Sequence, residues 1–162
     1  MRLPVEYLVP KYQDNLYQAA FAVLQNCADA QDAVQLVFIK YHRLEQEFEN
    51  EDHIRKWLFR LVINQARDIR RSFWRRHRAS ITEAVENIAE ELESGEDRAL
   101  FEAVCSLPGM YRITLQLFYY EDFSVREIAD LMSVSESAVK KRLSRGRQML
   151  RDVLEKEESR HV

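Results

Sequence analysis

The chain has 162 residues, of which 46% are hydrophobic and 31% charged, with only three Gly and three Pro. This balance is that of a folded protein, and the scarcity of turn-forming residues argues against a many-stranded β-fold. The longest uninterrupted apolar stretch, residues 19–24, is too short to span a membrane, and the first six residues lack the pattern of a signal peptide. We therefore expect an all-α, cytoplasmic protein without membrane insertion.

The net charge of −3 is unevenly distributed along the chain. Residues 1–79 carry 13 Lys and Arg against 10 Asp and Glu, residues 80–105 carry one against eight, and residues 106–162 carry 10 against nine. Two basic runs lie within these blocks: residues 67–78 contain six Arg and one Asp, and residues 140–151 contain six basic residues and no acid. Local basic patches of this kind indicate where a nucleic acid would bind better than the whole-chain charge does.

Three amphipathic helices are predicted in the first half of the chain. Apolar residues recur at three- and four-residue spacing over residues 12–26, 29–45 and about 52–73, and none of these segments alternates with the period of two that a strand shows. Asn50 or Asp52 can cap the start of the third helix. This third helix has the most regular stripe, formed by Ile54, Trp57, Leu58, Leu61, Val62, Ala66, Ile69 and Phe73.

An acidic segment, residues 80–95, separates these helices from a second helical region. Ser80 and Glu83 have capping-box spacing, so a partly helical linker and a solvated spacer both stay open. Further helices are predicted over residues 97–106, 110–120, 124–132 and 135–156, with Ser124, Glu127 and Ser135 as caps. The predicted architecture is therefore two small helical domains, 1–79 and 96–162, joined by an acidic linker over 80–95.

A short helix, a three-residue turn and a basic helix occupy about residues 124–146. This order is typical of a helix-turn-helix that places its second helix in the DNA major groove. Apolar residues such as Ile128 and Val139 would hold the two helices together, and Ser133 stands where glycine is common because the turn favours positive φ. The outward side chains suit base-edge and phosphate contacts, and they are Ser137, Lys140, Lys141, Ser144, Arg145 and Gln148. The alternative is an ordinary helical hairpin with a solvated basic face.

The third helix of the first half also combines arginine with aromatic residues. Arginine follows phosphates and aromatic rings stack on unpaired bases, which is what a single-strand binding surface requires. The side chains away from the apolar stripe are Asn64, Arg67, Asp68, Arg71 and Arg75, and the interleaved aromatic residues are Trp57, Phe59, Phe73 and Trp74. The alternative is that the aromatic residues, Trp57 first among them, belong to the core.

No metal site, cofactor site or catalytic group is predicted. Cys27 and Cys105 lie far apart, and the sequence contains no CxxC motif or Cys/His cluster. The close carboxylates Glu90–Glu91 and Asp29 with Asp32 have no neighbouring histidine or glycine-rich loop. We therefore expect a binding protein that is not an enzyme and needs no cofactor.

Four segments, in this order, resemble the extracytoplasmic-function sigma factors of bacterial RNA polymerase, a group within the sigma-70 family. They are DAQDAVQLVF at residues 29–38, WLFRLVIN at 57–64 with Asp68 and Arg70–Arg71, LPGMYR at 107–112, and Glu127–Ala129 with VKKRLSRGR at 139–147. The resemblance covers about residues 7–79 and 96–155. Leu36 departs from it, because the family usually has an acidic residue there, as does Ala138, where Thr is common.

The resemblance implies a sigma factor that binds core RNA polymerase and directs transcription initiation at specific promoters. Asp32, Gln35 and Phe38 would contact the polymerase. The polar residues of the third helix would read and melt the minus-ten element, with the preceding loop (about residues 47–52) forming a base pocket. The outward residues of the helix-turn-helix would read the minus-35 element. The resemblance also implies an anti-sigma factor as a partner.

The main alternative is an autonomous helix-turn-helix regulator that binds operator DNA as a dimer. It explains the helix-turn-helix but leaves the second basic helix and the acidic linker without a role. It requires self-association and tight DNA binding without polymerase. A protein–protein adaptor is partly contained in the sigma-factor interpretation, because polymerase binding is itself an adaptor function.

Overall fold

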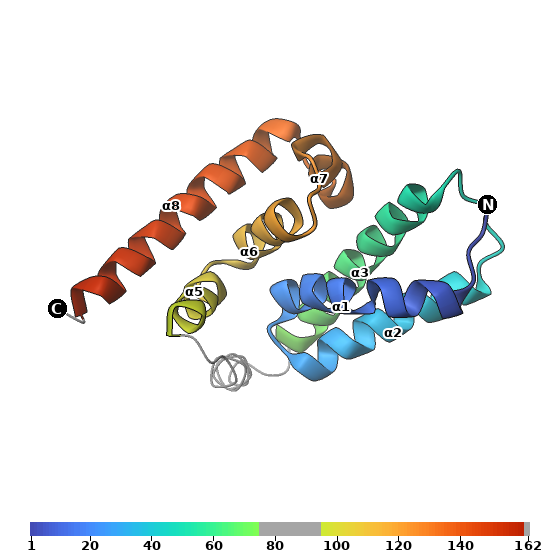
Figure 1. The fold of residues 1–162 in the computed structure, drawn as a ribbon, viewed down its shortest axis with the longest axis horizontal. Coiled ribbons are helices and arrows are strands. Elements are labelled where there is room, and N and C mark those ends of the chain that lie inside the picture. The colour runs from blue at the N-terminus through green and yellow to red at the C-terminus, as the bar shows by residue number, and fades with distance from the viewer. Residues whose placement is uncertain (75–94, 161–162) are drawn as a thin grey trace. The chain divides into compact units, whose positions relative to one another are not determined.

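The computed structural model describes residues 1–74 and 95–160, and within these ranges every regular element is a helix. The chain divides into two compact units, Met1–His77 and Arg78–Val162, and each has its own buried apolar residues. Figure 1 shows the helices of each unit. The predicted all-α fold is therefore confirmed. The predicted linker lies, apart from Gly95, outside the described residues.

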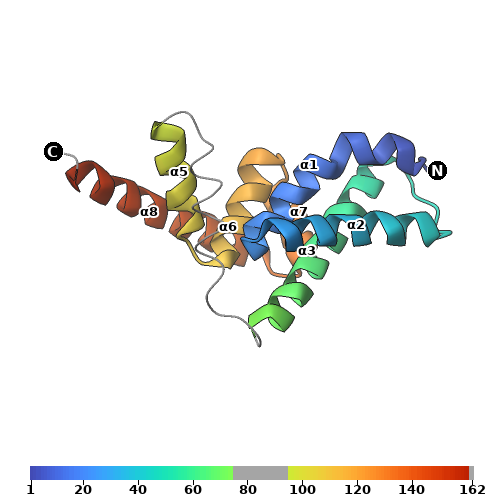
Figure 2. The ribbon, with the colours of Figure 1, turned by 90° about the horizontal axis from the view of Figure 1, so that it is seen from below.

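Three helices form the first unit: α1 (Val5–Leu24), α2 (Cys27–Arg43) and α3 (Glu51–Trp74). Each packs against the other two, and α1 and α2 lie side by side in both Figure 1 and Figure 2. Burial of the apolar stripe of each helix against the others holds the unit together. The fully buried side chains include Leu8, Leu16, Val37, Tyr41, Ile54, Leu58, Phe59, Val62 and Ile63.

Specific caps set the helix ends in this unit. Gln25 takes a left-handed φ of 52°, and its N–H donates to the Phe21 carbonyl at 2.8 Å, which ends α1. Asn26 then caps α2 by accepting from the Asp29 N–H at 2.9 Å. Asn50 caps α3 by accepting from the His53 N–H at 2.8 Å. Of the two candidate caps for the third helix, Asn50 is thus the one in use.

The first helix begins at Val5 rather than at residue 12, and it contains Pro10. Proline lacks a backbone N–H and usually ends or kinks a helix, which is why the expected start lay beyond it. Here the Pro4 carbonyl accepts from the N–H groups of Tyr7 (3.1 Å) and Leu8 (3.2 Å), and Leu8 is fully buried. Packing of this first turn therefore outweighs the one backbone bond that Pro10 removes.

The second unit contains α5 (Gly95–Cys105), α6 (Gly109–Leu115), the five-residue π-helix η1 (Gln116–Tyr120), α7 (Val125–Met132) and α8 (Glu136–Arg160). The long α8 contacts α5, α6 and α7, so it is the element on which this unit is assembled. The predicted break at residues 107–109 separates α5 from α6, and the buried guanidinium of Arg112 donates to the Leu107 carbonyl there. Among the described helices, none is long and apolar enough to cross a membrane.

Candidate nucleic-acid and protein interfaces

The second unit contains the predicted helix-turn-helix, with α7 and α8 as its two helices. Ser124 and Glu127 form a reciprocal capping box: the Ser124 Oγ accepts from the Glu127 N–H at 3.1 Å, and the Glu127 carboxylate accepts from the Ser124 N–H at 3.0 Å. Ser135 caps α8 by accepting from the Ala138 N–H at 3.1 Å. Ser133 has φ 55°, the left-handed conformation that the turn was expected to need. The caps and the turn are therefore as the sequence indicated.

Small and apolar residues seat α8 on the rest of the unit. Ile128 of α7 and Val139 and Leu143 of α8 are at most 3% exposed. Gly146 is also buried, and a Cβ atom built on it would lie 3.3 Å from the Leu115 Cδ1. The inner face of α8 is thus committed to packing, which leaves its outer face free for a partner.

The outer face of α8 carries the residues predicted to contact DNA. Ser137, Lys140, Lys141, Ser144 and Arg145 are all exposed. Gln148 is exposed too, and its amide donates to Asp152 at 2.9 Å, one turn further along. The helix therefore presents short polar side chains flanked by basic ones, which is the arrangement that suits base edges and phosphates.

The third helix of the first unit presents a second polar face. Asn64, Asp68 and Arg71 are exposed, whereas Arg67 is half-buried and engaged by other residues. Arg60 is exposed as well, and helical spacing places it on the same face, although the prediction omitted it. Its four- and eight-residue separation from Asn64 and Asp68 was the signal that could have found it. Arg75 and the side chains of Phe73 and Trp74 lie outside the described residues.

The aromatic residues predicted for this face divide between core and surface. Phe59 is fully buried, so the interpretation of this ring as a base-stacking surface is wrong. Trp57 is half-buried, and its ring meets those of Tyr41 and Phe48 edge-on, both with centroids 5.9 Å away. A three-residue offset decides between them, because Phe59 falls on the inward stripe with Ile63.

The exposed face of α2 is the candidate protein interface. Asp32 and Gln35 are exposed, but Phe38 is only 7% exposed and packs in the core beneath them. Leu36 and Ile39 are instead the exposed apolar residues, at 38% and 45%. Helical spacing brings both onto the face of Asp32 and Gln35. The outward turn of Leu36 and Ile39 was missed because the search favoured residues matching a family pattern.

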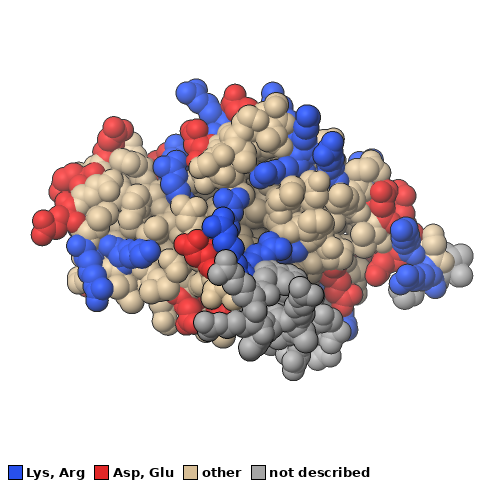
Figure 3. All heavy atoms as spheres, turned by 180° about the vertical axis from the view of Figure 1, so that it is seen from behind, with Lys and Arg blue, Asp and Glu red and all other residues tan. Residues whose placement is uncertain are grey.

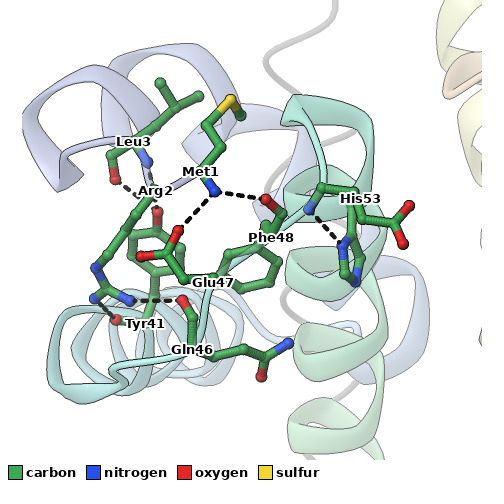
Figure 4. Close-up of polar contacts among 9 residues, drawn as sticks. Met1, Arg2, Leu3, Tyr41, Gln46, Glu47, Phe48 and His53 are labelled. Atoms are coloured by element: carbon green, nitrogen blue, oxygen red, sulfur yellow. Dashed lines mark hydrogen bonds and ion pairs between the residues drawn. The ribbon is translucent and has the colours of Figure 1, made fainter.

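The loop between α2 and α3, residues 44–50, is held by the first three residues of the chain (Figure 4). The Arg2 guanidinium donates to the carbonyls of Tyr41, His42 (3.3 Å) and Gln46 (3.4 Å), and it lies over the Tyr41 ring, 4.6 Å from its centroid. The Phe48 N–H donates to the Met1 carbonyl at 2.9 Å. The loop therefore depends on a segment more than 40 residues away in sequence.

A polar cluster follows that loop, at the start of α3. The Glu51 carboxylate accepts hydrogen bonds from Lys11, Tyr12 (2.7 Å) and Tyr7 (3.2 Å) of α1. The bond from Lys11, then that from Tyr12, holds the pKa of Glu51 below its ordinary value. Burial, followed by the bond to Glu51, raises the pKa of Tyr12 to about 12. The cluster ties α1 to the beginning of α3 without any sign of a catalytic arrangement.

Charged side chains of both signs are spread over the molecular surface. Figure 3 shows one face, where Lys and Arg are interspersed with Asp and Glu instead of forming one continuous basic surface. Within the described residues, no three His, Cys, Asp or Glu side chains are grouped so as to hold a metal ion. Recognition of an anionic partner would therefore depend on local faces such as that of α8.

Comparison with known proteins assigns both units. Residues 8–78 match the family model "Sigma-70 region 2", and residues 97–150 match "Sigma-70, region 4". RNA polymerase sigma factor SigV of Bacillus subtilis (strain 168) is 28% identical over 151 residues, which cover 93% of this chain and 90% of SigV.

Two solved structures have a similar fold. CnrH, in complex with the cytosolic domain of CnrY, has a TM-score of 0.65 and 26% identity, covering 93% of this chain and 87% of that one. The sigma factor RpoE of Bartonella quintana, in complex with the anti-sigma factor NepR, has a TM-score of 0.73, with 93% and 96% covered. Its identity of 19% makes it a likeness of fold alone. With both region models matched in order, the chain belongs to the extracytoplasmic-function group of the sigma-70 family.

Proposed function

We propose that the chain is a sigma factor that binds core RNA polymerase and directs initiation at promoters by recognising their minus-ten and minus-35 elements. The observation that carries the proposal is the exposed polar and basic face of α8, in a chain whose two parts match sigma regions 2 and 4. Such a protein acts by binding, and it is not itself an enzyme. Because bacterial polymerase works in the cytoplasm, the proposed function places the chain there.

The minus-35 element would be read by α8. Ser137, Lys141 and Ser144 face outward at helical spacing and suit base edges, while Lys140 and Arg145 flank them and suit phosphates. A recognition helix in the major groove contacts bases through its N-terminal turns, where these residues lie.

The minus-ten element would be read by α3. Asn64, Asp68 and Arg71 supply exposed polar groups on one face, with Arg67 beside them and Arg75 further along the sequence. The half-exposed Trp57 offers a ring edge near the start of the same helix, and the loop before it, about residues 47–52, would complete a pocket for an unpaired base.

Core polymerase would bind the outer face of α2. Asp32 and Gln35 are exposed there, and Leu36 and Ile39 add an apolar centre of the kind that carries binding energy in protein interfaces. Phe38 would act from beneath by supporting the helix. An anti-sigma factor is the second protein partner we propose, since the similar structure of RpoE contains one.

The test is run-off transcription with purified chain, bacterial core polymerase and a library of promoter fragments. We expect start sites only when chain and polymerase are both present. The double variant Lys141→Ala with Ser144→Ala should lower transcript yield at least about tenfold, since each lost base contact weakens recognition severalfold. The matched control is Lys156→Ala with Ser159→Ala, the same residue types exposed 15 positions further along α8, and it should keep its yield.

A different result would assign the chain elsewhere. If the chain alone bound a palindromic operator tightly, self-associated, and gained nothing from core polymerase, the sigma-factor function would be wrong. The autonomous dimeric regulator would then replace it.

A further inference from the structure

The first three residues act on the end of α2 in a way that a helix usually accomplishes with its own neighbours. The last carbonyls of a helix have no partner within the helix and carry a partial negative charge. Here the Arg2 guanidinium donates to the carbonyls of Tyr41 and His42, both in the last turn of α2. Arg2 is therefore a C-terminal cap supplied from 40 residues away.

The same segment also fastens the side chain of Tyr41. The Tyr41 hydroxyl donates to the Leu3 carbonyl at 2.6 Å and accepts from the Leu3 N–H at 3.1 Å, and Tyr41 is fully buried. The Tyr41 ring stacks on Phe48 with centroids 5.8 Å apart. Figure 4 shows Arg2, Tyr41 and Phe48 in this continuous arrangement.

The loop itself has few supports of its own. Among residues 44–50, Phe48 is the buried side chain, and the Glu49 N–H donates to the His53 Nδ1 at 3.1 Å. The remaining loop contacts come from the N-terminal segment: Arg2 to the Gln46 carbonyl, and the Met1 carbonyl to the Phe48 N–H. Phe48 in turn meets Trp57 of α3. The position of the loop relative to α3 is thus set from one side by residues 1–3.

We propose that Met1–Leu3 is a positioning element for the α2–α3 loop, with Arg2 as its central residue, and that it tunes discrimination among minus-ten bases. The proposal rests on the proposed function, in which this loop and α3 form the pocket for an unpaired base. Arg2 touches backbone carbonyls and an internal ring, so its role is to position the loop. A flexible loop accepts many bases because its contacts adapt, whereas a held loop rejects those that leave its groups unpaired.

Three variants of the full chain separate this role from general stability. Arg2→Ala removes the cap, Tyr41→Phe keeps the ring and removes both hydroxyl bonds to Leu3, and Arg2→Lys keeps the charge without the guanidinium fork. Arg43→Ala is the control, since it removes one positive charge from the same end of α2 and Arg43 is exposed. Tryptophan fluorescence confirms that each variant is folded at the assay temperature.

Two measurements are made on each variant. The first is amide hydrogen exchange over residues 44–50, measured without polymerase. The second is the ratio of transcript from the preferred promoter to transcript from promoters with single minus-ten substitutions. We expect Arg2→Ala and Tyr41→Phe to speed exchange of the Phe48 amide and to lower the ratio about fivefold. Arg2→Lys should lie between, and Arg43→Ala should match the natural chain.

Unchanged exchange in Arg2→Ala, or a uniform loss of transcript with an unchanged ratio, would overturn the positioning role. A natural chain that gave no polymerase-dependent transcript would instead overturn the proposed function. In that case the exchange measurement would still decide whether Arg2 holds the loop.

Discussion

Single side chains decide several local features of this protein. Ser133 adopts φ 55° although it is not glycine, and the capping box before it and the Ser135 cap after it hold the turn in place. Glu51 gathers three donors from α1 onto one carboxylate at the start of α3. Such residues set how adjacent helices meet, and Glu51 does so with a charge that titrates.

Glu51→Gln should destabilise the first unit at neutral pH and lose this effect in acid. The lowered pKa of Glu51 means that its contribution is present above pH 4.5 and disappears as pH falls through the pKa in the folded state. We expect a loss of about 1 kcal/mol at pH 7, mainly from the bond to the buried Tyr12, and a much smaller difference at pH 3.

Urea unfolding followed by tryptophan fluorescence checks this prediction, because both tryptophans, Trp57 and Trp74, lie in the first unit. Glu49→Gln is the control, since Glu49 is exposed and only its backbone is bonded to His53. An equal loss for Glu51→Gln at both pH values would show that the carboxylate charge is not the cause.

Helices in the second unit approach each other closely where side chains are small. Gly146 lies in α8 against Tyr111 and Leu115 of α6, and a Cβ atom there would lie 3.5 Å from the Tyr111 Cβ. Glycine weakens a helix by about 1 kcal/mol relative to alanine, so its use within α8 reflects the space available. This contact sets the distance between α6 and the helix proposed to read DNA.

Gly146→Leu should therefore separate α6 from α8. Leu115 is only 6% exposed and has little room to yield, so overpacking should cost the second unit about 2 kcal/mol. Thermal unfolding followed by circular dichroism measures the loss. Arg151→Leu, an exposed position of the same helix, is the control and should change stability little. A stability for Gly146→Leu equal to that of the control would mean that the contact is not tight.

The whole molecule combines two small units, each with one proposed DNA-reading helix. The net charge of −3 means that long-range attraction to DNA is weak, and binding depends on local faces. Tethering two weak sites raises affinity only when their geometry lets both engage at once. In the proposed function, the polymerase supplies that geometry.

The chain alone should bind promoter fragments weakly, with a Kd of about a micromolar or more, and binding should fall steeply with salt. Adding core polymerase should tighten binding by at least about a hundredfold. Fluorescence anisotropy with a labelled promoter, at low and physiological salt and with and without polymerase, measures both. Nanomolar binding by the free chain at physiological salt would contradict this view.

The sequence by itself determined the helical fold, the helix-turn-helix and its caps. Apolar spacing and capping signals act within a few residues, so Ser124, Ser133 and Ser135 could be assigned before any packing was known. The outward face of α8 followed from the same periodicity, because one stripe of that helix is strongly apolar.

Only the tertiary structure decided which neighbouring residues turn inward and which distant ones meet. Phe38 and Phe59 are buried while Leu36 and Ile39 are exposed, since the helix rotation is set by contacts with two other helices that no local pattern specifies. Residues 1–3 had no signal of their own, and α1 continues through Pro10 because Leu8 is buried. The bonds of Arg2 to Tyr41, His42 and Gln46 form only when folding brings together segments about 40 residues apart.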